Sequence, residues 1–210
     1  MYLIKALYPH NIEKTLKTEC KKLNESLLLS NFKQYATLVC NDYEAGKTFD
    51  STATKYWDEL SKSCIKLKKL IEKKIKIVYT DYDPYPDAIT MRKMVMKENI
   101  MKVWDGFKPH PYFNEEQQLI WRAVHDYFTH ILAKENFDLR GELKAYNTHS
   151  RLAPKSALPA LFTEIPGIVC SYIVKNIFPK QKICVLWNFD FRKIGMVKNY
   201  DIVDKKLIKK

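Results

Sequence analysis

Glycine is scarce in this chain and occurs only five times in 210 residues. Phosphate-binding loops of the GxGxxG and P-loop types need closely spaced glycines, and neither pattern is present. Turn-rich all-β folds also depend on glycine, whereas helices do not. Hydrophobic residues make up 46% of the chain and aromatic residues 13%, which excludes a disordered tail or linker. The composition therefore favours a helix-rich globular protein.

Most of the chain shows apolar residues at helical spacing, and only a few short stretches alternate. The spacing predicts helices at 11–29, 51–72, 88–98, 114–133, 139–151 and 156–177, the fourth with a capping box from Asn114 and Gln117. Short strands are predicted at 73–80, 100–104 and 182–187. We expect a predominantly helical α+β fold, in which a helix cluster carries a buried His/carboxylate site.

Positive charge is concentrated at the two ends of the chain. The net charge is +12, to which residues 1–105 contribute +5, residues 106–174 contribute nothing and residues 175–210 contribute +7. Lysine accounts for 31 of the 36 basic residues, and lysine contacts phosphate more than base edges. The Lys-rich ends therefore predict binding to nucleic acid or to an acidic partner.

The turn-forming tract 81–87 indicates a domain boundary. It separates an N-terminal helical region at 1–80 from a core domain at 81–197, which is followed by a basic tail at 198–210. No stretch reaches the roughly 18 apolar residues of a membrane span, so we expect no membrane contact. Five scattered cysteines without a CxxC pattern favour a reducing compartment.

The helix predicted at 114–133 carries an unusual polar side. His125, Asp126 and His130 lie opposite its apolar face, where a chain so rich in lysine would normally place Lys and Glu. This composition favours a lined site, with plain solvent-facing surface as the alternative. At about 100° per residue, His125 and His130 are roughly 140° apart on an α-helix, so the spacing does not predict one ion held from one face.

The next two helices add inward-facing acids and a histidine. Glu142 and His149 share the face that the helix at 139–151 should bury. Glu164 is the lone charge in an apolar helix, so it needs a partner such as Arg122, Arg140, a histidine or a metal ion. A structural Glu–His pair or Glu–Arg bridge is the alternative to a functional site.

Histidines and carboxylates from several helices are typical ligands of Zn, Fe or Mn. The predicted metal ligands are His125, His130, Glu142, His149 and Glu164. Asp126, as a base or as a group that orients a ligand, and Glu164 are the predicted catalytic residues. The first hypothesis is a metal-dependent hydrolase in which the divalent ion activates a water.

The chain reads His125-Asp126-Tyr-Phe-Thr-His130, then Gly141-Glu142, His149 and Thr163-Glu164. Over about residues 82–195 this pattern resembles an uncharacterised family, encoded mostly in tailed-bacteriophage genomes, with an HDxxxH, GE, H and TE signature. The resemblance implies a phage protein that acts in the cytoplasm of a bacterial host or is packaged in the virion. It implies no activity.

Two other hypotheses remain open at this point. One is a virion or assembly protein that contacts other phage structural proteins and uses the polar cluster only as internal support. The other is a nucleic-acid-binding accessory protein that acts through its Lys-rich ends. The basic ends favour these two hypotheses, whereas the inward-facing acids and histidines favour the hydrolase.

Overall fold

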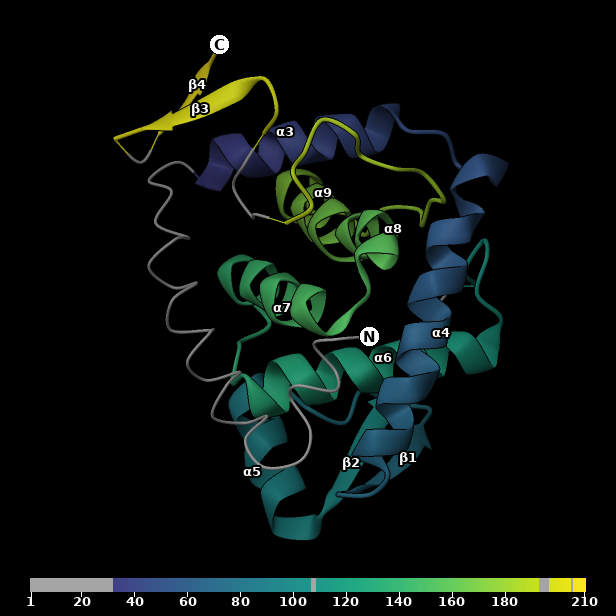
Figure 1. Ribbon diagram of the computed structural model, residues 1–210. Helices are drawn as coiled ribbons and strands as arrows, with labels where there is room; N and C mark the ends of the chain where they lie inside the picture. The colour runs from purple at the N-terminus through teal and green to yellow at the C-terminus, as the bar shows by residue number, and fades with distance from the viewer. Residues whose placement is uncertain (1–31, 107–108, 193–196, 205) are drawn as a thin grey trace.

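A computed structural model describes residues 32–106, 109–192, 197–204 and 206–210. It has the expected predominantly helical α+β fold (Figure 1). The helices described are α3 (Phe32–Ala45), α4 (Thr54–Ile71), α5 (Ala88–Glu98), α6 (Glu115–His125), α7 (Leu139–Leu152), α8 (Leu158–Phe162) and α9 (Ile168–Lys175). The strands described are β1 (Lys76–Thr80), β2 (Ile100–Trp104), β3 (Tyr200–Val203) and β4 (Lys206–Lys209). The helix predicted at 11–29 lies outside the described residues.

Two of the helices continue into π-helical segments, in which backbone hydrogen bonds join residues five apart. The first π segment, Asp126–Leu132, extends α6, and the second, Thr163–Gly167, joins α8 to α9. Pro166 lies inside the second and has no N–H to donate to a helical hydrogen bond. Such segments are rare and often occur at functional sites. Each of these two carries a residue that the sequence analysis singled out.

Strands β1 and β2 pair in parallel, with Lys76 opposite Ile100 and Thr80 opposite Trp104. Helix α5 connects them, and its N-cap Asp87 accepts a hydrogen bond from the backbone N–H of Thr90. Helix α6 begins with the predicted capping box of Asn114 and Gln117, which is confirmed. The parallel pair places the carboxyl ends of both strands together, on the side from which β2 leads towards α6.

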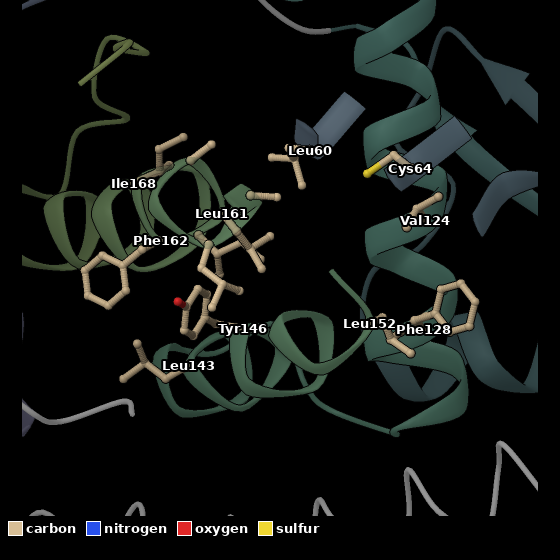
Figure 2. Packing of buried hydrophobic residues seen from close by; sticks show 14 of the residues in the cluster. Leu60, Cys64, Val124, Phe128, Leu143, Tyr146, Leu152, Leu161, Phe162 and Ile168 are labelled. Atoms are coloured by element: carbon tan, nitrogen blue, oxygen red, sulfur yellow. The ribbon is translucent and has the colours of Figure 1, made fainter. Parts of the chain in front are cut away.

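The hydrophobic core lies between α4, α6, α7, α8 and α9 (Figures 1 and 2). Trp57 of α4 is fully buried, and the rings of Tyr146 and Phe162 meet edge to face between α7 and α8 at 5.3 Å. Helix α3 packs along α9. Described residues on both sides of the predicted boundary near residue 80 therefore share one core.

Two expectations for the C-terminal region are corrected. Residues 182–187 do not form a strand, because Ile183 makes only an isolated bridge to Phe49 while Cys184 and Leu186 are buried against the core. The expected basic tail at 198–210 instead forms the antiparallel β3–β4 hairpin. Leu207 is buried, which anchors the hairpin to the body of the protein.

The helical stretch Lys155–Lys175 is long and apolar enough to cross a membrane by length and composition. In the structure, however, 78% of its most apolar window is buried inside the protein. This stretch includes α8 and α9, which contact α3, α4 and α7. It therefore behaves as a core helix.

Candidate metal centre

The first π segment brings His125 and His130 onto one face. Its wider turn is marked by the hydrogen bond from the backbone N–H of Ala133 to the carbonyl of Phe128, five residues earlier. The Thr129 hydroxyl also donates to the carbonyl of His125. The angle of about 140° predicted between the two histidines assumed a regular α-helix. It does not hold here, because a turn closed by hydrogen bonds between i and i+5 contains more residues, so each residue rotates less and residues five apart come closer to one face.

Glu142 of α7 completes a group of three donors with these histidines. The two Nε2 atoms of His125 and His130 are 3.1 Å apart. The Glu142 carboxylate lies 3.3 Å from His125 Nε2 and 3.4 Å from His130 Nε2. One donor atom from each residue falls within 4.8 Å of the other two, which is close enough for a shared metal ion.

The spacing of the two Nε2 atoms is close to that in a tetrahedral zinc site, and each of them faces a different oxygen of the Glu142 carboxylate. When ligand atoms lie about 2.0–2.1 Å from Zn²⁺, neighbouring ligand atoms are about 3.3–3.4 Å apart. The His130 side chain is 2% exposed, whereas the side chains of His125 and Glu142 are 15% and 14% exposed. Structural zinc sites are closed by four protein ligands, whereas catalytic zinc sites have three protein ligands and an open fourth position.

Backbone carbonyls fix the orientation of His130. Its Nδ1 lies 3.1 Å from the carbonyl oxygen of Glu135, which can only accept, so Nδ1 carries a proton. Because Nδ1 holds its proton in this contact, Nε2 is the ring atom that would bind a metal ion in place of a proton, and it faces His125 and Glu142. Arg92 donates to the carbonyls of both His130 and Glu135 at 3.2 Å and so holds this turn in place. Metal-binding histidines commonly donate their other ring N–H in this way.

Glu142 and His130 stabilise each other's charged forms. Burial by itself raises the pKa of Glu142, but hydrogen bonds from His125 and His130 outweigh burial and lower it to about 2. Burial lowers the pKa of His130, but the hydrogen bond and the charge of Glu142 outweigh it and raise this pKa. Glu142 is therefore a carboxylate at neutral pH, which is the form that binds a cation.

His149 lies beside the cluster but outside the group of three. It is fully buried, its ring stacks on Trp121 at 5.0 Å, and its centroid is 6.4 Å from that of His125. Neither of its ring nitrogens has a hydrogen-bond partner among the described residues. Burial, with a contribution from His125, lowers its pKa to about 3, so the ring is neutral. The structure thus places this predicted ligand next to His125 and not among the converging donors.

The unpartnered nitrogens of His149 lead to a stability prediction. His149→Phe keeps a flat ring against Trp121 and removes two buried polar atoms, each of which costs free energy when unsatisfied. We expect the free energy of unfolding of the metal-free variant to be unchanged or to rise by up to about 2 kcal/mol. Urea unfolding of the two metal-free proteins measures this difference. A loss of more than about 2 kcal/mol would show that His149 makes a polar interaction in the native protein.

A pocket of about 290 Å³ lies at the carboxyl ends of β1 and β2. Asp83 and Tyr85 line it after β1, Trp104 lines it at the end of β2, and Arg122 and Asp126 line it from α6 and the first π segment. Burial raises the pKa of Asp126, against the opposing influence of His130, His125 and Arg122. Asp126 thus lines the pocket and lies close enough to both histidines to interact with their charges.

Phe137 also connects the pocket with the cluster. Its ring lines the pocket and meets the His130 ring edge to face at 4.6 Å. Among the other lining residues, the Arg122 guanidinium lies 5.3 Å from the centre of the Trp104 ring and donates to the Trp104 carbonyl. The pocket therefore borders the candidate metal centre and presents a carboxylate and a guanidinium.

Glu164 belongs to a different buried cluster, which corrects its predicted role as a metal ligand. Its Oε1 accepts hydrogen bonds from Trp57 Nε1 at 2.7 Å and from His110 Nε2 at 2.9 Å. His110 Nδ1 accepts from the backbone N–H groups of Tyr112 and Phe113, so the proton of the neutral ring is on Nε2. Glu164, Trp57 and His110 form what we call the Glu164 cluster.

Several residues that build these sites were not identified from the sequence. In the sequence His110 is marked only by its place between Pro109 and Pro111, and Trp57 only by the apolar spacing of its helix. Glu135 and Arg92 act on His130 through backbone carbonyls, and no sequence pattern announces such contacts.

Comparison of the chain with protein-family models, curated proteins and solved structures found no match. The resemblance to the phage family therefore stays a prediction. What the structure establishes is a mainly helical α+β protein with a His/Glu cluster that could hold a metal ion.

Proposed function

We propose that His125, His130 and Glu142 bind a divalent transition metal, most simply Zn²⁺, and that the protein is a metal-dependent hydrolase. The observation that carries this proposal is the convergence of one donor atom from each of the three residues within 4.8 Å of one another, with the two imidazole Nε2 atoms 3.1 Å apart. Two imidazoles and one carboxylate suit Zn²⁺ or Fe²⁺ better than Mg²⁺ or Ca²⁺, which prefer oxygen ligands.

A divalent ion held there would lower the pKa of a water in its open coordination position and so supply a nucleophile at neutral pH. Asp126 is suited to hold or accept a proton, because it lies next to His125 in sequence and lines the adjoining pocket. Arg122 is suited to position a polar group of the substrate, because its guanidinium lines the same pocket. The pocket is the substrate site in this proposal.

The first test is metal content and activity of protein purified without a His tag. We expect close to one equivalent of Zn, Fe or Mn per chain, or uptake of one equivalent of Zn²⁺ by the metal-free protein. The loaded protein should hydrolyse at least one of a panel of ester, phosphoester and amide substrates. Asp126→Asn should retain the metal and lose most of the activity, by about 100-fold or more for a general base.

The outcomes separate the two parts of the proposal. Protein that takes up no metal from Zn²⁺, Fe²⁺ or Mn²⁺ solutions would contradict the metal site. Stoichiometric metal with no hydrolysis of any substrate class, or with activity unchanged in Asp126→Asn, would contradict the hydrolase mechanism while leaving the metal site in place.

A further inference from the structure

Far from the metal centre in sequence, an exposed tryptophan is surrounded by aromatic rings and lysines. Trp187 is 54% exposed, and its ring lies 6.1 Å from that of Tyr56 and 5.9 Å from that of Phe191. The ammonium group of Lys198 lies 5.9 Å from the centre of the Trp187 ring, and that of Lys55 lies 5.1 Å from the Tyr56 ring. We call these five residues the aromatic–lysine surface.

The chain holds Trp187 firmly although most of its ring faces solvent. Its neighbours Leu186 and Phe189 are buried, and Phe189 bridges to Val197. The backbone N–H of Lys198 donates to the carbonyl of Asn188, which fixes the lysine beside the ring. An exposed large ring on an anchored loop loses little freedom when a ligand stacks on it, which favours binding.

The charge of this surface is positive and uncompensated. Neither Lys55 nor Lys198 forms an ion pair within the part of the chain that the structure describes, and both are exposed. The acids closest in sequence to Lys55 are engaged elsewhere, since Asp58 accepts from Tyr112 and Glu59 pairs with Lys62. Asp201, the acid closest to Lys198, pairs with Lys210, and Asp190 accepts a hydrogen bond from the backbone N–H of Arg192. Residues 175–210 carry ten basic and three acidic side chains. An anionic partner therefore complements this surface.

We infer that the aromatic–lysine surface binds single-stranded nucleic acid, with a base stacked on Trp187 and phosphates near Lys55 and Lys198. Stacking needs a base whose face is free, which a single strand offers and an intact duplex does not. Stacked aromatics next to a positively charged track are the common basis of single-strand binding without sequence preference. This inference is independent of the proposed hydrolase.

The test is fluorescence anisotropy with a labelled oligothymidine of about 20 nucleotides, longer than the typical site. We expect binding that weakens steeply between about 50 and 200 mM salt. Trp187→Ala should weaken binding by about 5- to 100-fold, the effect typical of one lost stacking contact. The double variant Lys55→Ala/Lys198→Ala should weaken binding and also reduce its salt dependence.

Phe178→Ala is the matched control, because Phe178 is 57% exposed and packs against another ring, Tyr172. It should bind like the unmodified protein, and melting temperatures should confirm that every variant is folded. The inference is overturned by an absence of binding at low salt, by equal losses in Trp187→Ala and Phe178→Ala, or by equally tight binding of a blunt duplex. It is also overturned if Trp187→Ala changes only the oligomeric state in light scattering, which would make the surface a contact between copies.

Discussion

Glu142→Gln is expected to weaken Zn²⁺ binding by more than about 100-fold, since loss of groups that merely orient metal ligands already costs about 10- to 100-fold. The amide keeps the size of the side chain but loses the negative charge that faces His125 and His130. The fold should survive, because the side chain is at the more accessible edge of the cluster. Competition titration with a chromophoric chelator measures the change in affinity.

Glu135→Gln is the matched control for this experiment. Glu135 is also buried and also near His130, but it reaches the ring through its backbone carbonyl, while its carboxylate lies 3.8 Å from Lys144. The substitution should leave Zn²⁺ affinity within a few-fold of the original. Equal affinities for Glu142→Gln and the unmodified protein would mean that the three residues form a structural charge cluster and no metal centre.

Glu164→Ala is expected to lower the free energy of unfolding by about 3–5 kcal/mol. The change leaves the Trp57 indole N–H and the His110 ring N–H buried without their acceptor and also creates a small cavity. For a chain of this length the melting temperature should fall by roughly 6–20 °C. Differential scanning calorimetry of the metal-free proteins measures it.

Glu164→Gln separates the two effects of that substitution. Its amide oxygen can still accept both hydrogen bonds, so it should cost only about 1–2 kcal/mol. Zn²⁺ stoichiometry should stay the same in both variants, since the Glu164 cluster is not part of the metal centre. Loss of the metal in Glu164→Gln would restore Glu164 as a ligand and contradict the separation of the two clusters.

Much of the fold could be predicted from the sequence, because it depends on local signals. The helix at 88–98 and the strand at 100–104 have the predicted bounds, since a turn tract and helical or alternating spacing define them locally. The strand predicted at 182–187 was wrong because a buried, irregular segment and a strand can have the same apolar composition. Only tertiary contacts, here the burial of Cys184 and Leu186 in the core, distinguish a strand from an irregular segment.

The sequence predicted the kinds of residue that form the site, but not which of them lie together. The polar side of α6 and the inward face of α7 predicted a site that includes His125, His130 and Glu142, and the structure brings these three residues together. Glu164 was assigned to the same site, because no local pattern shows that its partners lie 54 and 107 residues away in sequence. The Glu164 carboxylate accepts hydrogen bonds from His110 in a loop and from the indole of Trp57 in the core. Only the folded chain brings these groups together.

The first π segment has a consequence for how this protein could have arisen. A π turn is an α-helix that holds one residue more than its regular hydrogen bonding accommodates. Removing one residue between His125 and His130 would restore regular α-helical hydrogen bonding with a spacing of four, which also places two side chains on one face of a helix. The residues before and after the turn would keep their orientation. A single-codon insertion or deletion can therefore convert this π turn and an α-helix into each other while the histidine pair is kept. Related chains should differ here in length as readily as in residue type.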